Sequence, residues 1–310
     1  MSQAKSEQPA RPNSTRLAIL IPFAIVTLIW GSTWIVITGQ LGVVPPTWSV
    51  TYRFLLGGTA MLAFAAAKRQ SLKLDARGVG FAALVGLLQF ALNFNFVYRA
   101  ELHVTSGLVA VVFALLLVPN ALLSRIFLGQ RLGRQLLIGS GIAMAGVALL
   151  FVHEIRNDPS GGGAVYLGIG LTLLGVLSAS TANVMQATKT AGRYAMVPTL
   201  GWAMLIGALA DGIFAWITTG PPVFDPRPAY VAGLLYLGIV ASAVAFPLYF
   251  GVLRVIGPAK AAYSSVIIPV LAMLLSTVFE GYRWSLLAAG GAALAGVGLV
   301  LALRARRPAR

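Results

Sequence analysis

The feature that most constrains the fold of this chain is a succession of ten apolar segments, each about as long as a bilayer is thick. A helix needs about 20 apolar residues to cross the hydrocarbon core, whereas a barrel strand needs about half as many and alternates in polarity. Because these runs are continuous and do not alternate, they predict an all-α polytopic membrane protein. The predicted transmembrane helices cover residues 17–38, 48–67, 78–98, 104–124, 135–152, 164–186, 197–218, 229–252, 259–279 and 285–303.

Composition also indicates a membrane protein. Hydrophobic residues make up 58% of the chain, charged residues only 10%, and the mean hydropathy is +0.85, well outside the range of soluble domains. The chain has no cysteine, which excludes disulfides, thiolate nucleophiles and sulfur-ligated metal centres. The first apolar run is long enough to span and lacks a small-residue cleavage site, so we expect a retained helix rather than a signal peptide.

The distribution of lysine and arginine predicts the orientation. If the N-terminus is cytoplasmic, eighteen of the 23 cations fall on the cytoplasmic side, four fall on the other side and Arg53 lies inside a span. This asymmetry follows the positive-inside rule, so both termini are expected in the cytoplasm. The net charge of +15 then lies beside anionic headgroups, and the lipid bilayer, not a nucleic acid, is the expected partner of these residues.

The chain contains an internal repeat. "GSGIAMAGVALL" begins at Gly139 and "GGAALAGVGLVL" at Gly290, and a shift of 150 residues also brings Pro119 onto Pro269. Each copy would hold five spans, and because five is odd the second copy enters the membrane from the opposite face. Inverted repeats of this kind are typical of secondary transporters that work by alternating access. The expected organisation is an N-terminal tail (1–16), a first repeat (17–152), an external linker (153–163), a second repeat (164–303) and a basic C-terminal tail (304–310).

The sequence also resembles a known family. The stretches "YRAELHVTSGLVAVVFALLLVPNALLSRIFLGQRLGRQLLIGSGIAMAGVALLF" and "YFGVLRVIGPAKAAYSSVIIPVLAMLLSTVFEGYRWSLLAAGGAALAGVGLVL" each resemble the second half of an EamA domain of the drug/metabolite transporter superfamily. Within it the chain is similar to bacterial amino acid exporters of the aromatic amino acid exporter (YddG-like) kind. The resemblance implies ten spans, an inner-membrane location and efflux of amino acids or related metabolites. Gln130 departs from the family pattern, which usually has Glu after the fourth span, whereas the second copy keeps Glu280.

Polar and aromatic residues deep in the spans are the candidates for a substrate site. Unpaired amides are costly in hydrocarbon, so such side chains either bind a solute or form interhelical hydrogen bonds. Aromatic residues in the same spans either line a cavity or belong to the core. The candidate substrate-binding residues are Trp30, Gln89, Asn93, Phe113, Ser180, Asn183, Ser242, Phe246, Tyr249 and Tyr263.

Charged residues inside the spans are few. Arg53 and Asp211 lie a few residues from span ends, and we interpret both as structural, with Arg53 anchored at the interface or paired with backbone carbonyls. Trp34, near a span end, is assigned to an aromatic belt. With no carboxylate at the centre, a facilitative or weakly coupled carrier is favoured, and its substrate is expected to be an amino acid or similar zwitterion whose carboxylate takes donors from amide, indole or phenol groups.

Two prolines within predicted helices suggest where the carrier bends. Pro119 and Pro269 each remove a backbone hydrogen bond, which should free the carbonyls of Leu115 and Ser265. We expect paired hinges, with static kinks as the alternative. No catalytic constellation, metal site or cofactor is expected. A channel, or an exporter of another small metabolite or drug, is the alternative function, and the protein is expected to be a monomer or a homodimer.

Overall fold

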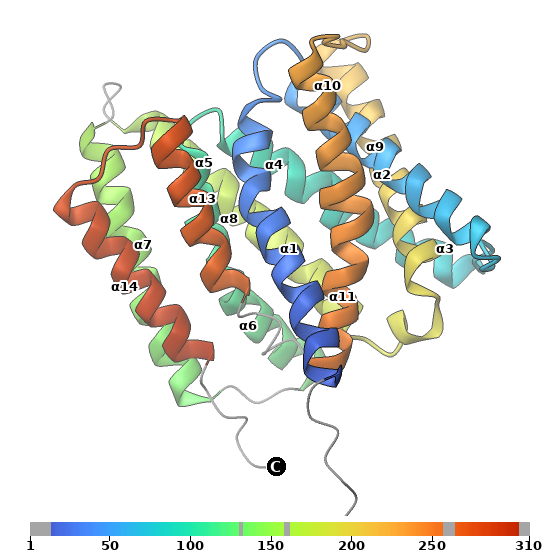
Figure 1. The fold of residues 1–310 in the computed structure, drawn as a ribbon, viewed down its shortest axis with the longest axis horizontal. Helices are drawn as coiled ribbons and strands as arrows, with labels where there is room; N and C mark the ends of the chain where they lie inside the picture. Colours follow the sequence, from blue (N-terminus) through green and yellow to red (C-terminus); the bar gives the residue numbers. More distant parts are fainter. Residues whose placement is uncertain (1–13, 130–132, 158–161, 257–263, 304–310) are drawn as a thin grey trace, which may run out of the picture.

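The computed structural model describes residues 14–129, 133–157, 162–256 and 264–303, and these residues form helices and connecting turns without any strand (Figure 1). The first half contains α1 (Ser14–Thr38), α2 (Pro46–Ala67), α3 (Ala76–Val85), η1 (Gly86–Leu92), α4 (Asn93–Ala100), α5 (Ser106–Phe113), η2 (Ala114–Leu116), α6 (Leu117–Leu128) and α7 (Arg134–Asn157). The second half contains α8 (Gly163–Gln186), η3 (Ala191–Arg193), α9 (Met196–Thr219), α10 (Pro228–Leu235), η4 (Tyr236–Val244), α11 (Ala245–Ile256), α13 (Ser264–Phe279) and α14 (Leu286–Leu303).

Most of the predicted spans are present at nearly the predicted positions. Within the described residues, eight helical stretches are long and apolar enough to cross a membrane, among them the continuous runs α3–η1–α4, α5–η2–α6 and α10–η4–α11. The stretches Ile267–Phe279 and Leu286–Ala302 are shorter apolar helices. The prediction of a helical polytopic membrane protein is therefore confirmed, with eight of its spans meeting the length of a full crossing.

Local sequence explains where several helices begin and end. Pro46 and Pro228 occupy the first turn of α2 and α10, where the missing N–H of proline would be unsatisfied in any case. Asp75 precedes α3, and its Oδ1 accepts a hydrogen bond of 2.7 Å from the Gly78 amide, a typical N-cap. Gly129 ends α6 with a φ of 66°, the left-handed conformation that glycine adopts without strain.

The third helix of each half contains a π-helical segment that the sequence did not predict. Segment η1 begins at Gly86 and η4 at Tyr236, which is the 150-residue shift of the repeat. A π-helical turn inserts an extra residue and rotates the side chains that follow, and such turns are frequent at functional sites. Both halves therefore share the same local distortion at equivalent positions of the repeat, as expected of two copies of one fold.

Equivalent helices of the two halves pack against each other. Helix α7 lies along α14, and α2 lies along α9. A Cβ added at Gly146 of α7 would lie 2.6 Å from the Gly291 carbonyl oxygen, and one added at Gly298 of α14 would lie 2.6 Å from the Gly139 carbonyl oxygen. The repeated small-residue stretches thus face each other within one chain, since only glycine lets the two backbones come this close.

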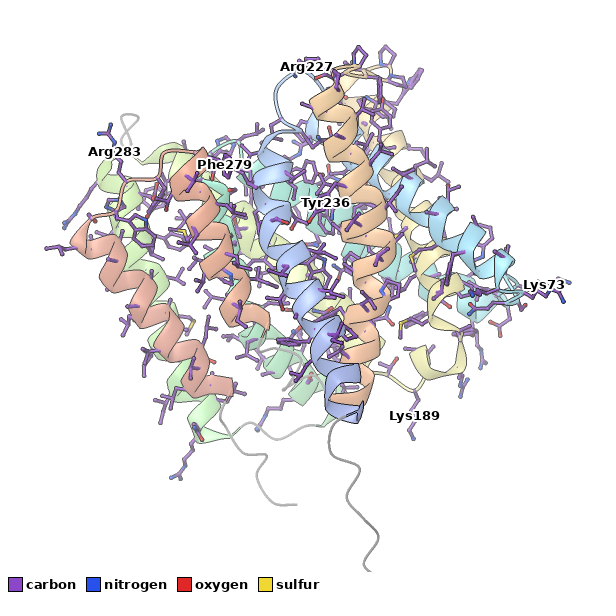
Figure 2. All side chains as sticks on the ribbon, in the orientation of Figure 1. Lys73, Lys189, Arg227, Tyr236, Phe279 and Arg283 are labelled. Carbon is purple, nitrogen blue, oxygen red and sulfur yellow. The ribbon has the colours of Figure 1, made fainter. Side chains whose placement is uncertain are left out.

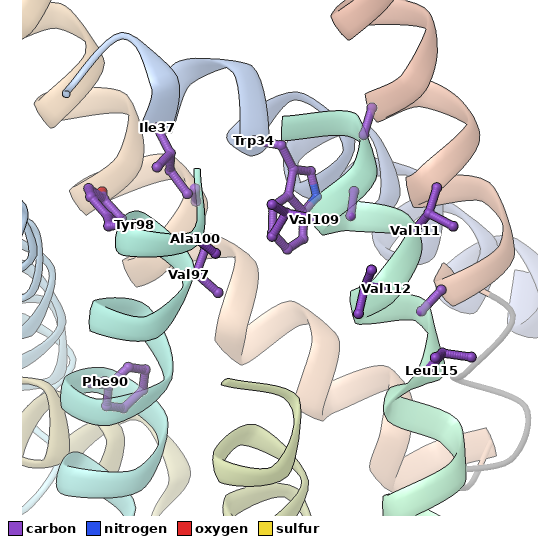
Figure 3. Packing of buried hydrophobic residues seen from close by; sticks show 14 of the residues in the cluster. Trp34, Ile37, Phe90, Val97, Tyr98, Ala100, Val109, Val111, Val112 and Leu115 are labelled. Atoms are coloured by element: carbon purple, nitrogen blue, oxygen red, sulfur yellow. The ribbon is translucent and has the colours of Figure 1, made fainter. Parts of the chain in front are cut away.

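The buried core extends across both halves. In Figure 3 the Trp34 indole of α1 lies between α4, which carries Val97 and Tyr98, and α5, which carries Val109. Trp34 is only 8% exposed and its ring centroid is 5.4 Å from that of Phe113. The expectation that Trp34 belongs to an aromatic belt is wrong, because neighbouring helices cover this end of α1.

Basic residues that were predicted to face opposite sides of the membrane lie at opposite ends of the bundle. Helix α1 begins and α14 ends at the same lower end of the bundle (Figure 1). Figure 2 shows Lys189 at that end and Arg227 and Arg283 at the opposite end. Lys189 is among the cations predicted to face the cytoplasm, and Arg227 and Arg283 are among the four predicted to face outward.

Candidate functional site

A cavity of about 120 Å³ lies between the two halves of the bundle. Its walls come from α1, α2, η1, α4, α5 and η2 of the first half and from α8, α11 and α13 of the second. Seven of the ten predicted site residues line it, although they come from six helical segments spread over both halves of the chain. These residues are Trp30, Gln89, Asn93, Phe113, Asn183, Phe246 and Tyr249.

Aromatic rings form one wall of the cavity. The centroid of the Trp30 ring is 5.2 Å from that of Phe246 and 4.8 Å from that of Tyr249, distances typical of tilted aromatic pairs. The Trp30 indole N–H donates a 3.2 Å hydrogen bond to the Ala241 carbonyl in η4. The Trp30 indole, one of the groups expected to donate to a carboxylate, therefore already has an acceptor within the protein, and its ring faces the cavity.

Two amide side chains supply acceptors. Gln89 is 6% exposed and Asn93 is 1% exposed. The Asn93 side-chain nitrogen donates to the Gln89 backbone carbonyl at 3.2 Å, while Gln89 Oε1 and Asn93 Oδ1 have no hydrogen-bond partner. Buried polar atoms are nearly always paired, so these two oxygens are unused acceptors on residues that line the cavity.

Arg53 lies in the cavity wall and not at the interface. Its side chain is 1% exposed, and its Nε donates a 3.1 Å hydrogen bond to Ser242 Oγ. The guanidinium carbon lies 4.3 Å from the centroid of the Phe94 ring, within the range of a cation–π interaction. The interpretation of Arg53 as an interfacial anchor is wrong, because α9 and η4 enclose this part of α2.

Other predicted residues lie beside the cavity or away from it. Ser242 is buried and does not line the cavity, and its hydroxyl donates to the Leu237 carbonyl at 2.7 Å. Ser180 likewise does not line the cavity and donates to the Leu116 carbonyl at 3.4 Å. Asp211 accepts a 2.6 Å hydrogen bond from Asn95 at the contact of α4 and α9. Tyr263 lies outside the described residues.

The two prolines occupy different settings. Pro269 is inside α13 and lines the cavity. Pro119 lies in the first turn of α6, directly after the 3-10 segment η2. The turn directly before Pro119 is therefore wound more tightly than an α-helix. A carbonyl in this turn, that of Leu116, accepts the hydrogen bond from the Ser180 hydroxyl.

Two carboxylates, those of Glu101 and Glu280, come together at one end of the bundle, and sequence analysis did not identify Glu101. The Thr38 hydroxyl lies 3.0 Å from Glu101 Oε2 and 3.4 Å from Glu280 Oε1. Burial raises the pKa of Glu101 well above its ordinary value, the Thr38 hydrogen bond lowers it in part, and the nearby charge of Glu280 raises it further. Glu101 follows α4 in a turn, where a glutamate is usually exposed, so only tertiary packing reveals its burial.

A cavity enclosed by helices of two similar halves, with polar groups on an apolar wall, is the site architecture of a membrane transporter. The chain belongs to the EamA-like transporter family, whose model matches residues 17–152 and 166–304.

Several proteins of known sequence are similar over most of the chain. An inner membrane transporter of uncharacterized function from Escherichia coli, YedA, is 30% identical over 82% of this chain and 80% of its own length. Protein PagO from Salmonella typhimurium is 24% identical over 87% of this chain and 88% of its own length. A protein from Salmonella typhimurium named "Probable amino-acid metabolite efflux pump" is 25% identical over 92% of this chain and 96% of its own length.

A solved crystal structure of a protein has the same fold. It superposes with a TM-score of 0.68 and covers 94% of this chain and 98% of its own, at 23% sequence identity. At this level of identity the match concerns the fold alone.

Proposed function

We propose that this transporter is a carrier of the bacterial inner membrane that exports amino acids with apolar or aromatic side chains, and related metabolites, by alternating access. It crosses the membrane ten times as two inverted repeats and has both termini in the cytoplasm. The placement of Lys189 opposite Arg227 and Arg283 (Figure 2) supports this topology. The names of YedA and of the efflux pump relative support the location and the solute class.

The observation that carries the proposal is the pairing of an apolar wall with unpaired amide oxygens in one cavity. An amino acid has an ammonium group that needs acceptors, and Gln89 Oε1 and Asn93 Oδ1 are acceptors without partners. Its side chain needs an apolar surface, and Trp30 presents its ring face because its N–H is already bonded. Phe113 and Asn183 complete the wall from helices of opposite halves.

Alternating access is supported by the symmetry of the two halves. The π-helical segments η1 and η4 occupy equivalent positions, and Pro119 and Pro269 lie at equivalent positions of the two repeats, 150 residues apart. Two similar halves of opposite orientation can exchange conformations at low energetic cost. With no carboxylate among the described cavity residues, facilitated or weakly coupled transport fits this site better than strong proton coupling.

Flux into liposomes tests the proposal. Purified protein should take up phenylalanine or leucine with saturation, and amino acid on the far side should accelerate uptake, which a channel would not show. Trp30→Ala and Gln89→Ala should reduce uptake about tenfold or more while the detergent melting temperature stays near wild type. Trp216→Ala is the matched control, since Trp216 is 58% exposed on the outer surface of α9. Unaltered uptake in both cavity variants would reject this site.

A further inference from the structure

The second helix places one permanent positive charge against the cavity. Among the described residues that line it, Arg53 is the only lysine, arginine, aspartate or glutamate. A guanidinium stays protonated in proteins, and a buried charge is strongly unfavourable unless an opposite charge or several hydrogen bonds compensate it. The compensation available to Arg53 therefore decides what the cavity can hold.

That compensation is incomplete. Ser242 accepts one hydrogen bond from Nε, and the Phe94 ring faces the guanidinium. Among the described residues the one ion pair within 4.0 Å is Arg227 with Asp225, so Arg53 has no carboxylate at that distance. The Tyr98 side chain and, beyond 4.0 Å, the Glu101 carboxylate also interact electrostatically with Arg53. Its Nη1 is buried without any hydrogen-bond partner. One side of the guanidinium fork is thus unsatisfied, although this residue type is the one best suited to bind a carboxylate.

We propose that Arg53 binds the carboxylate of the transported solute and thereby restricts the carrier to molecules that bring one carboxylate into the cavity. The inference rests on the proposed function and names the chemical group that the site selects. An amino acid would neutralise Arg53 and place its ammonium at Gln89 and Asn93. An amine would instead add a second positive charge and leave Nη1 unpaired. An amino acid amide would add the same charge and offer Nη1 only a neutral carbonyl acceptor, so both bind more weakly than the acid.

Ser242 acts as the positioning residue for this contact. Its hydroxyl donates to the Leu237 carbonyl inside η4 and so turns an oxygen lone pair toward Arg53 Nε. This geometry depends on the π-helical turn, since the bond joins residues five apart. The unusual segment of the second repeat therefore holds the cation of the first repeat in the cavity wall.

Binding of matched compound pairs to the full-length protein in detergent tests the inference. The pairs are phenylalanine with phenylalaninamide and leucine with leucinamide, and the Kd of each compound is measured by thermal stabilisation and by competition for uptake. The wild-type protein should prefer the acid of each pair about tenfold or more. Arg53→Gln should abolish this preference by weakening acid binding, with amide binding unchanged or improved.

Additional variants separate a binding role from a folding role. Arg53→Lys keeps the charge without the fork and should retain part of the preference, so it replaces Arg53→Gln if the latter does not fold. Ser242→Ala should weaken binding of the acid but not of the amide. Arg99→Gln is the control, since Arg99 does not line the cavity and donates to Thr47 instead.

The possible results distinguish this inference from the proposed function. If Arg53→Gln and Arg53→Lys keep the wild-type preference while Trp30→Ala impairs uptake, the role of Arg53 is wrong and the amino acid carrier stands. If the wild-type protein prefers the amides, the role of Arg53 is also wrong. If the wild-type protein binds no member of either pair, both proposals are rejected.

Discussion

The carboxylate of Glu280, at the end of α13, accepts both hydrogen bonds that Ser106 donates at the start of α5. The Ser106 amide lies 3.2 Å from Oε1 and the Ser106 hydroxyl lies 2.6 Å from Oε2. A negative charge at a helix N-terminus is stabilising because it pairs free N–H groups and complements the helix dipole. A residue of the second repeat therefore caps a helix of the first, at the end of the bundle opposite Lys189.

Loss of this cap should open the end of the bundle that it closes. Glu280→Ala leaves the Ser106 amide and hydroxyl without their acceptor, at a cost of about 1–2 kcal/mol to the closed arrangement. A cysteine introduced at Ala114, which lines the cavity, should then react faster with an impermeant thiol reagent added from outside. Asp75→Ala removes an exposed cap elsewhere and should leave this rate unchanged. An equal rate in both variants would contradict a closing role for Glu280.

Closure should depend on pH through Glu101. Burial first, and the Glu280 charge in addition, raise the pKa of Glu101, against the Thr38 hydrogen bond and the positive charge of Arg53, which lower it. The closed arrangement thus binds a proton more tightly than an open, hydrated one, whose pKa is near 4.5. The relevant pH window runs from about 4.5, the pKa of Glu101 in the open arrangement, up to its raised pKa in the closed one. Within this window the closed arrangement is favoured at lower pH and is lost as the pH rises.

The same cysteine at Ala114 measures this dependence. Its outside labelling rate is divided at each pH by that of the exposed cysteine in Pro222→Cys, because the thiolate fraction of any cysteine rises with pH. This ratio should increase with pH across that window in the wild-type background and become independent of pH in Glu101→Gln. A ratio that falls as pH rises would show that the sign is wrong.

The contact of α7 with α14 should tolerate no side chain at Gly146. A Cβ there would lie 2.6 Å from the Gly291 carbonyl oxygen, whereas a Cβ at Gly141 meets nothing within 4 Å. Gly146→Val should therefore destabilise the protein by roughly 1–3 kcal/mol, as overpacking does, and lower its detergent melting temperature. Gly141→Val on the same helix is the control and should have little effect. Equal shifts would mean that helix propensity, not the close contact, sets the cost.

The two prolines should affect opposite faces of the carrier. Pro119→Ala and Pro269→Ala each restore a backbone N–H and favour a straighter helix. The probe is a cysteine introduced at Ala179, another residue that lines the cavity. Because the two prolines are related by the inverted repeat, the two variants should shift the outside labelling rate of this cysteine in opposite directions. Both variants should also slow exchange. Shifts of the same sign would reject the paired hinges and leave static kinks.

Orientation can be tested directly because the natural chain has no cysteine. Ser71→Cys, between α2 and α3, and Pro222→Cys, between α9 and α10, introduce single exposed thiols. In intact cells an impermeant thiol reagent should label Pro222→Cys and not Ser71→Cys until the membrane is permeabilised. Labelling of both in intact cells would be incompatible with the proposed inverted topology.

The sequence by itself determined the class of fold, the approximate position of most spans and the existence of the repeat. Long apolar runs have only one stable arrangement in a bilayer, because every backbone hydrogen bond must form within the segment. Depth in a span also identified Trp30, Gln89 and Asn93 as residues of the interior, and all three line the cavity.

Only the tertiary structure decided which polar groups face the cavity and which are already satisfied. Arg53 lies near the start of a span by sequence, yet α2 approaches η4 so closely that a Cβ at Gly57 would lie 2.9 Å from the Gly238 carbonyl oxygen, and this contact helps enclose the arginine. The π-helical turns change the helical register, so a regular 3.6-residue period misplaces the side chains that follow. Depth is a property of one helix, whereas the direction and pairing of a side chain depend on the helices packed around it. For this reason the sequence showed the interior but not the unpaired Nη1 of Arg53 within it.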